Sequence, residues 1–389
     1  MKKTLCSVFL FLYSLTVFSQ KAKNQSILVD THNDFLSISV DEKVSFDKDL
    51  RSKTYSDLNR MFEGGVNVQF FSIFCDDNYG KGSAFNYANR EIDSLYAVCA
   101  RNPDRMSLVS DWKSLSLALK QHKLAAMLGV EGGHMIEDDL NKLDSFSKRG
   151  VRYMTLTWNN STSWASSARD ESDHAFVVTP YGLTTFGKDV VRRMNELGMM
   201  VDISHVGEKT FWDVINTTTK PVIASHSSVY ALCSVFRNLK DDQIKAIAKN
   251  KGVIQVNFYS GFLDSTFARR LSSFFASHQP ELDSLQKIKT PDYRVKNYFS
   301  KKYPKEAEAL RPPLSIILDH IDYIVKLVGV DYVGLGSDFD GIDSAPKGLD
   351  GVQDYPKIAT GLRERGYSEK DIDKILGGNL LRVFRANGN

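Results

Sequence analysis

Six side chains that can bind metal each lie at or just past the end of an apolar, β-branched run. His32 and Asp34 follow ILVD (27–30) in the stretch VDTHNDF, and Glu131 ends LAAMLGVE (124–131). The others are His205 at the end of MMVDISH, His226 at the end of PVIASH, and Asp338 near the end of DYVGLGSDF. Residues two apart on a strand share a face. The His32 and Asp34 side chains therefore point the same way, either as a buried ion pair or as two ligands of one metal.

These donors are all nitrogen or oxygen, which favours zinc, allows manganese or iron, and disfavours magnesium. An open zinc site needs three protein ligands and a water. The five groups His32, Asp34, Glu131, His205 and His226 suit two metals instead, sharing one carboxylate with a water or hydroxide between them. Glu131 is the expected bridge, because its strand lies between the two ligand groups and the following Gly-Gly pair leaves room.

Each of these residues also has a purely structural interpretation. A histidine at a strand end is most often a hydrogen-bonded structural residue, and the in-strand Asp30 and Asp202 are expected to support loop backbone or ligand imidazoles. His134, in EGGH, is interpreted as an outer-shell residue. The metal hypothesis rests on the number of such residues, because chance alone would seldom place several potential ligands at the ends of different strands.

Eight apolar runs are the candidate strands that must position these groups. They span 27–30, 66–74, 124–131, 151–158, 199–205, 221–226, 252–259 and 331–339, and helical patterns such as 186–198, 241–250 and 313–329 lie between them. Alternating strands and helices predict an α/β fold, a (β/α)₈ TIM-like barrel, with an open doubly wound sheet as the alternative. In a barrel the carboxyl ends of the strands meet at one face.

One segment breaks this alternation. Residues 260–312 are rich in charged and aromatic side chains and predict a partly helical insertion after strand seven. This insertion is interpreted as a lid, a dimer contact or a solvent-exposed segment with no role. The remaining chain, residues 21–389, is expected to form a single barrel domain that includes this insertion.

Residues 1–20 predict a secretion signal: two lysines, an apolar run too short to span a bilayer, then small polar residues. Removing the two lysines lowers the net charge from +3 to +1, which argues against nucleic acid as a partner. The mature protein is expected to be periplasmic or secreted, with no transmembrane helix. Export permits one disulfide among Cys75, Cys99 and Cys233, and Cys75–Cys99 is preferred because these residues flank one predicted helix.

The motifs HND, VEGGH, DISHV, ASHSS and GSDFDG occur in this order after strands one, three, five, six and eight. Together with YMTLTW, GLTTFG and GGNLLRVF they resemble the membrane (renal-type) dipeptidases, the M19 metallopeptidases with amidohydrolase-like barrels. The resemblance covers essentially the whole mature chain. It implies a zinc-dependent dipeptidase with two Zn²⁺ per chain, and a homodimer.

The resemblance also implies roles for individual residues. His32 and Asp34 would bind one zinc, His205 and His226 the second, and Glu131 both. Asp338 corresponds to the proton-transferring aspartate, although Asp340 shares its face. Further substrate-binding candidates are Arg237, which would hold the terminal carboxylate of the substrate, and Tyr259, for which a packed aromatic is the alternative.

Trp158 departs from the family pattern. The family usually has a histidine there, at the end of strand four, which contacts substrate and stabilises the oxyanion. An indole N–H donates a hydrogen bond but carries no charge. Either Trp158 donates this bond weakly, or His174 or Arg169 from the following segment replaces the histidine.

The predicted reaction is hydrolysis of the peptide bond of dipeptides by a hydroxide that bridges the metals, with Asp338 as general base and then acid. One alternative is another dinuclear amidohydrolase, acting on N-acyl amino acids, lactones or phosphoesters. A second is a catalytically idle binding protein that keeps its metals, suggested by the missing histidine.

Overall fold

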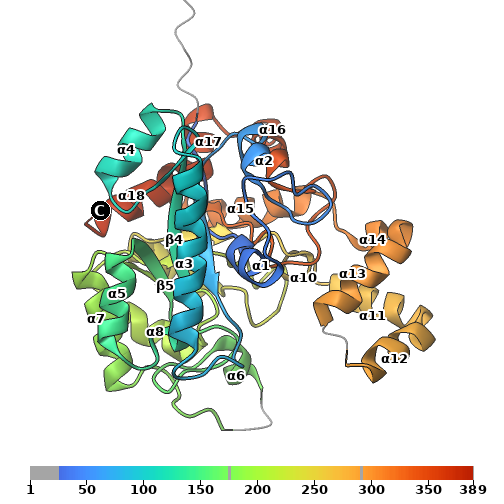
Figure 1. Cartoon of the computed structure of the whole chain (residues 1–389), viewed down its shortest axis with the longest axis horizontal. Helices are drawn as coiled ribbons and strands as arrows, with labels where there is room; N and C mark the ends of the chain where they lie inside the picture. The colour runs from blue at the N-terminus through green and yellow to red at the C-terminus, as the bar shows by residue number, and fades with distance from the viewer. Residues whose placement is uncertain (1–25, 174–176, 290–291, 389) are drawn as a thin grey trace, which may run out of the picture.

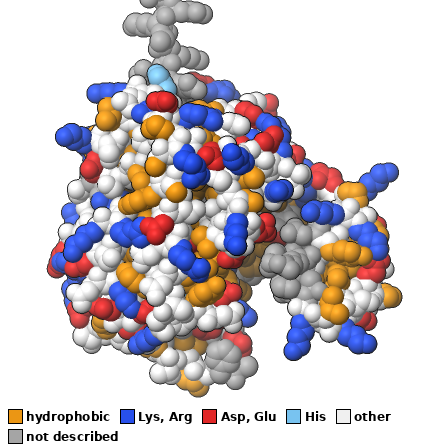
Figure 2. All heavy atoms as spheres, viewed as in Figure 1, with side chains coloured by type: hydrophobic (Ala, Val, Ile, Leu, Met, Phe, Trp, Pro, Cys, Tyr) orange, Lys and Arg blue, Asp and Glu red, His pale blue; other side chains and the backbone are white. Residues whose placement is uncertain are grey.

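The computed structural model describes residues 26–173, 177–289 and 292–388. The predicted secretion signal, residues 1–20, and His174 lie outside the described residues. Among the residues that are described, no helix combines the length and apolar character needed to cross a bilayer. Lys/Arg and Asp/Glu side chains are interspersed over the visible face in Figure 2, in keeping with the small net charge.

A parallel sheet runs through the chain in the order β1-β2-β4-β5-β6-β7-β8-β9. These strands are β1 Leu28–Asp30, β2 Val66–Phe74, β4 Leu124–Glu131, β5 Val151–Thr155, β6 Met200–Asp202, β7 Ile223–Ala224, β8 Val253–Val256 and β9 Val333–Leu335. An additional short strand, β3 (Met106–Leu108), pairs only with β4 among the described strands. The sequence pattern did not predict β3, because so short a strand carries too little periodicity.

The first and last strands come together through backbone hydrogen bonds just past their ends. Thr31 N–H donates to Leu335 O at 3.3 Å, and Asp338 N–H donates to His32 O at 3.2 Å. Asn33 and Phe339 form an isolated parallel bridge beside them. The sheet is therefore a nearly closed parallel barrel, which confirms the predicted (β/α)₈ architecture and excludes the open sheet.

Helices surround the barrel (Figure 1). They are α1 Phe35–Glu42, α2 Leu58–Glu63, α3 Ala84–Arg101, α4 Trp112–Lys120, α5 Leu140–Lys148, α6 Ala168–Ser172, α7 Thr185–Glu196, α8 Glu208–Thr217, α9 Asp241–Lys249, α15 Ser315–Val328, α16 Pro356–Glu364, α17 Glu369–Asp373 and α18 Asn379–Ala386. Short helical turns of other types span Gly133–Ile136, Val330–Tyr332, Val352–Asp354 and Lys374–Gly378. Inside the barrel, Val68, Phe70, Met127, Tyr153 and Met200 belong to one buried cluster.

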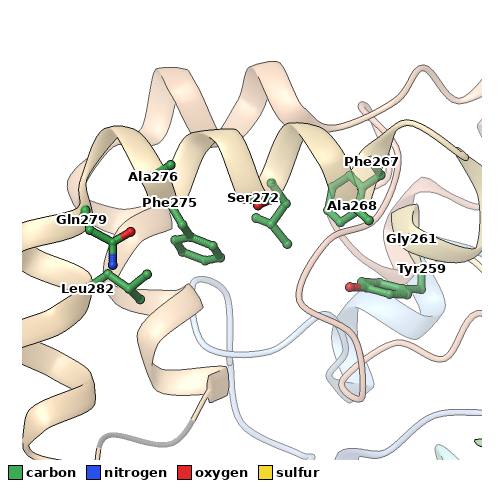
Figure 3. A pocket seen from close by; sticks show the side chains of 10 residues that line it. Tyr259, Gly261, Phe267, Ala268, Ser272, Phe275, Ala276, Gln279 and Leu282 are labelled. Carbon is green, nitrogen blue, oxygen red and sulfur yellow. The ribbon is translucent and has the colours of Figure 1, made fainter. Parts of the chain in front are cut away.

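The predicted insertion is helical nearly throughout. It comprises α10 Ser260–Leu263, α11 Phe267–Ser277, α12 Gln279–Lys287, α13 Asp292–Lys302 and α14 Pro304–Leu310. Figure 1 shows α11 to α14 projecting from the barrel as a separate lobe. Phe274, Val295 and Phe299 form a small core of their own within this lobe. An apolar groove of about 500 Å³ runs along α11, from Tyr259 near the barrel to Leu282 on α12 (Figure 3).

The preferred disulfide was wrong, because Cys75, Cys99 and Cys233 are all free and buried. Cys75 follows β2 at the carboxyl end of the barrel. Cys99 lies near the far end of α3, a helix of 18 residues and therefore about 27 Å long. Two cysteines placed before and at the far end of such a helix cannot reach the Cα separation of about 4.4–6.8 Å that a disulfide requires.

Candidate metal centre

The structure brings the predicted ligand groups together at the carboxyl end of the barrel. Glu131, the last residue of β4, lies at the centre of the cluster. Its Oε2 atom is 3.2 Å from His32 Nε2, and its Oε1 atom is 2.9 Å from His205 Nε2 and 3.4 Å from His226 Nε2. His32 Nε2 is in turn 3.6 Å from Asp34 Oδ2. One carboxylate therefore contacts imidazoles from both predicted ligand groups.

Most of these residues lie beyond the strands rather than at their last position. His205 and Asp338 each come shortly after the observed strand end. Both have left-handed backbone conformations, with φ of 63° and 61°, which non-glycine residues seldom adopt. The predicted strands 199–205 and 331–339 were consequently too long, because these two residues turn the chain away from the sheet. Such backbone outliers cluster at functional sites.

The three imidazoles each use Nδ1 for a hydrogen bond outside the cluster. His32 Nδ1 lies 2.9 Å from the Tyr153 hydroxyl, which itself donates to Thr31 O at 3.1 Å. The Tyr153 hydroxyl hydrogen is therefore used in the bond to Thr31 O. The hydrogen between the Tyr153 oxygen and His32 Nδ1 consequently belongs to His32. His205 Nδ1 faces Asn159 Oδ1 at 3.2 Å, which likewise places a proton on Nδ1.

His226 has the same arrangement through a relay. Its Nδ1 lies 2.8 Å from Ser225 Oγ, and Ser225 Oγ donates to Asp202 Oδ2 at 2.5 Å. Asp202 therefore supports the imidazole of a candidate ligand through Ser225, which is one of the two roles expected for its buried carboxylate. In a neutral imidazole only one nitrogen is protonated, so His205 and His226, and His32 when it is neutral, present their Nε2 lone pairs to the cluster.

Lone pairs facing lone pairs repel unless a cation lies among them. His205 Nε2 and His226 Nε2 are 2.9 Å apart, and both face a carboxylate oxygen of Glu131. Asp34 Oδ1 is buried and has no hydrogen-bond partner among the described residues. The donor set and these contacts fit metal ions, with two three-residue groups of suitable geometry: His32, Glu131 and His226, and His32, Asp34 and Asp338.

The electrostatics of the pocket point the same way. Burial disfavours a charged imidazole at His32, yet Tyr153, Asp34 and Glu131 raise the pKa of His32 well above its usual value. The pocket thus favours positive charge at that position. Burial and the Arg237 guanidinium lower the pKa of His205 to about 4, and burial together with His32 lowers the pKa of His226 well below its usual value. Both imidazoles are therefore neutral near pH 7, the form in which a histidine can bind a metal.

Asp338 and Arg237 lie next to the cluster. Asp338 Oδ2 accepts a hydrogen bond from Asn257 Nδ2 at 2.8 Å. Burial and the charge of Asp34 raise the pKa of Asp338 well above its usual value. Asp340 points elsewhere: it accepts hydrogen bonds from Ser56, Tyr55 N–H and Asn33. Of the two aspartates weighed for proton transfer, Asp338 is therefore the one beside the cluster.

The buried Arg237 side chain retains free donors. It lies over the Phe262 ring, with its guanidinium carbon 5.3 Å from the ring centroid, and Nη2 donates to His226 O at 3.4 Å. Its Nε atom has no partner within the described part of the chain. Burial lowers the pKa of Arg237 to about 10, so the guanidinium stays charged at neutral pH.

The two aromatic candidates occupy different surroundings. Trp158 is half-buried and packs against Phe74, with ring centroids 5.0 Å apart. Tyr259 is half-buried beside the edges of the Phe262 and Phe267 rings and lines the inner end of the groove in Figure 3. Arg169 is exposed on α6, which does not support it as the replacement for a histidine at 158.

Sequence reasoning did not identify the hydrogen-bond partners Tyr153, Asn159 and Ser225. Strand periodicity could have found Tyr153, because it lies two positions before Thr155, which pairs with Glu131, and so shares the inward face of β5. Ser225 directly precedes His226 in the sequence. Asn159 lies in an irregular loop, where no periodicity predicts the direction of a side chain.

Comparison with known proteins identifies the family. Residues 18–389 match the sequence profile of Membrane dipeptidase (Peptidase family M19), and the chain belongs to this family of metallopeptidases. It is 33% identical to mouse Dipeptidase 3 over 362 residues, covering 92% of this chain and 64% of that protein. It is 32% identical to an uncharacterised dipeptidase, C965.12, of Schizosaccharomyces pombe, covering 95% of this chain and 82% of that one.

Solved structures share the fold. The probable dipeptidase PvdM from Pseudomonas aeruginosa superposes with a TM-score of 0.76 at 24% identity, covering 93% of this chain and 96% of that one. A metallo peptidase from Rhodobacter sphaeroides, bound to a phosphinate mimic of L-Ala-D-Ala, gives a TM-score of 0.74 at 23% identity, covering 93% and 100%. The chain thus has the M19 fold over nearly its whole length, but spans only 64% of the mouse Dipeptidase 3 sequence.

Proposed function

We propose that this protein is a zinc-dependent dipeptidase, with two Zn²⁺ held by His32 and Asp34 on one side, His205 and His226 on the other, and Glu131 between them. The observation that carries the proposal is the convergence of imidazole Nε2 atoms and carboxylates on one buried centre, where His205 Nε2 and His226 Nε2 lie 2.9 Å apart and both face Glu131 Oε1. Membership of the M19 family supports the same function. When bound, the two cations would polarise the scissile carbonyl and acidify a water.

The side chains around this centre would bind and orient a dipeptide. Arg237 offers a planar guanidinium, whose Nε lacks a partner among the described residues, for the terminal carboxylate. Asp338, fixed by the Asn257 hydrogen bond, is placed to take a proton from the attacking water and deliver it to the leaving amine. Because the carboxylate-binding group is buried beside the cluster, short peptides fit and internal segments of proteins do not.

Hydrolysis of a dipeptide panel by the purified mature chain, with and without added zinc, tests this function. We expect zinc-dependent turnover, and a loss of about 10²–10⁴-fold in kcat for Asp338→Asn. The matched control is Asp340→Asn, which removes a neighbouring half-buried carboxylate that faces Ser56 and Tyr55 instead. Zinc-dependent turnover of N-acyl amino acids or lactones alone would replace the dipeptidase by another amidohydrolase. Bound zinc without any turnover would indicate a binding protein.

We further propose that the chain is exported, as residues 1–20 suggest, and is periplasmic or secreted as a homodimer. Mass spectrometry of the protein from each cellular fraction would locate the cleavage site. Light scattering of the purified protein would give its mass, which for the uncleaved chain is 43.8 kDa per copy. An uncleaved chain in the cytoplasmic fraction contradicts export, and a monomer mass contradicts the dimer.

A further inference from the structure

Two aromatic side chains form a wall at one side of the metal centre. Phe74 is the last residue of β2, and Trp158 lies shortly beyond β5. Their ring centroids are 5.0 Å apart with an interplanar angle of 58°, and both side chains are half-buried. We call this pair the aromatic wall.

Strand alternation places Phe74 at the mouth of the barrel. Val68 and Phe70 belong to the buried cluster that contains Tyr153, and the Ser72 hydroxyl donates to Glu131 Oε2 at 3.4 Å. Phe74 comes two positions later and so lies on the same inward face. It is also the register partner of Glu131 across β2 and β4. The Phe74 ring is therefore at the level of the predicted bridging carboxylate.

Trp158 completes the wall from the other side of Glu131. Its neighbours Thr157 and Asn159 both contact His205, through Thr157 Oγ1 to His205 O at 3.2 Å and Asn159 Oδ1 to His205 Nδ1 at 3.2 Å. The Trp158 side chain leaves the chain toward Gly132 instead. A Cβ atom placed on Gly132 would lie 3.5 Å from Trp158 Cβ.

The wall and the carboxylate-binding group lie on different sides of the mouth. In the strand order, β2, β4 and β5 are adjacent, whereas Arg237 follows β7 on the other side of β6. Consecutive Cα atoms of a peptide are only about 3.8 Å apart, so a dipeptide is short but spans more than one subsite. A dipeptide with its carboxylate on Arg237 and its scissile carbonyl at the cluster therefore extends its N-terminal residue toward the wall.

We propose that the aromatic wall selects dipeptides whose N-terminal residue has an apolar side chain. This inference rests on the proposed function, because it assumes that Arg237 holds the carboxylate. Phe74 and Trp158 offer an apolar surface to leucine, whereas a glutamate side chain would lose water there without gaining a partner. A difference of a methylene or more in an apolar pocket discriminates by roughly 10–200-fold.

Titration calorimetry on zinc-loaded Asp338→Asn protein tests the selection without relying on turnover. We expect Leu-Gly to bind at least about 10-fold more tightly than Glu-Gly. Gly-Leu and Gly-Glu carry the variable side chain on the C-terminal residue and serve as the internal control. Their affinities should differ by less than those of Leu-Gly and Glu-Gly. Equal affinities for Leu-Gly and Glu-Gly, or no binding of either, would overturn the proposal. Turnover by the parent enzyme tests the dipeptidase function separately.

Substitutions of Trp158 test whether the preference for Leu-Gly over Glu-Gly arises at this residue. In the same background Trp158→Ala should reduce the Leu-Gly preference about 10-fold, and Trp158→Phe, which keeps an aromatic ring, should retain most of it. Trp112→Ala is the matched control, because this tryptophan starts α4 after β3, whose residue Leu108 pairs near the amino end of β4. Thermal unfolding confirms that each variant folds. An unchanged preference in folded Trp158→Ala overturns the assignment.

Discussion

At the scale of single residues, each candidate ligand imidazole is oriented by a different acceptor. The acceptor is the Tyr153 hydroxyl for His32 and the Asn159 side-chain oxygen for His205. For His226 it is Ser225 Oγ, which itself donates to Asp202. The Tyr153 ring has room because residue 129 is glycine: a Cβ there would lie 1.9 Å from Tyr153 Cζ. Such outer partners fix the tautomer and orientation of a ligand histidine and commonly change metal affinity by about 10–100-fold.

Tyr153→Phe is therefore expected to weaken the metal position built on His32 by about 10–100-fold, while the ring still fills the barrel. Zinc content after dialysis against a competing chelator measures this, and one metal should leave before the other. Tyr96→Phe is the matched control, because its hydroxyl donates to Arg149 O at 2.6 Å outside the barrel. Equal zinc retention in Tyr153→Phe and the parent would contradict the role.

His320 joins three parts of the molecule. Its Nδ1 accepts from Val229 N–H at 3.0 Å, and its Nε2 donates to Leu263 O at 3.1 Å. The residue sits on α15 and so ties the loop that carries Arg237 to the start of the insertion. Burial lowers the pKa of His320 to about 4, because the protonated form would lose water and its Val229 bond.

Stability should consequently fall in acid through His320. Below the unfolded pKa of about 6.5 the unfolded chain binds the proton and the folded chain does not, so the free energy of unfolding drops as pH falls from about 6.5 to 4. The full loss is about 3 kcal/mol, with no contribution above that window. Urea unfolding of metal-free protein at pH 7 and pH 4.5 measures it. The difference between parent and His320→Gln should shrink at pH 4.5, and parallel pH curves would contradict the prediction.

At the scale of elements, long strands were predicted well and short ones were not. β2 and β4 have the predicted bounds 66–74 and 124–131, because both are continuous apolar runs buried in the sheet. β7 is only Ile223–Ala224: before it Val222 N–H bonds to Asn250 Oδ1, and after it Ser225 and His226 belong to the candidate metal centre. The ligand candidates were visible because each follows an apolar run. The contact between Phe74 and Trp158 was not, because it depends on strand register and on a loop.

The insertion is a group of helices that pack around a small apolar core of their own. Phe299 is fully buried there and contacts the rings of Phe274, Phe275 and Tyr303. Where the lobe meets the barrel, the Tyr259 ring contacts Phe267 of α11, and Lys296 of α13 pairs with Asp343 beyond β9; Tyr259 and Phe267 are both labelled in Figure 3.

Phe299→Ala should therefore cost about 3–5 kcal/mol locally, enough to open α11 to α14 while the barrel stays folded. Hydrogen exchange measured by mass spectrometry separates the two regions. Faster exchange is expected in α11 to α14 alone, with α15 and the strands unchanged. Leu117→Ala, at an exposed apolar residue of α4, is the control. Uniformly faster exchange throughout the chain would show that the lobe is not an independent unit.

At the scale of the whole molecule, the candidate metal centre joins strands from every part of the barrel. Without cations, Glu131 faces the Nε2 atoms of the neutral His205 and His226, and Asp34 Oδ1 has no partner in the described part of the chain. Chelation is therefore expected to destabilise the whole fold, by about 4 kcal/mol if free zinc had been at about 1,000 times its Kd. Thermal unfolding should show a midpoint lower by several degrees, restored by zinc. Glu131→Ala should respond little to zinc, and a parent midpoint unaffected by chelation would contradict the coupling.

The barrel closes where the chain's first strand meets its last. Asp338 N–H bonds to His32 O there, and His226, the last of the five proposed ligands along the sequence, is made well before Asp338. During synthesis at about 5–20 residues per second, His226 emerges roughly 6 to 22 s ahead of Asp338. A ribosome-bound or prematurely terminated chain thus possesses the five proposed metal ligands while still lacking Asp338, the proposed proton carrier.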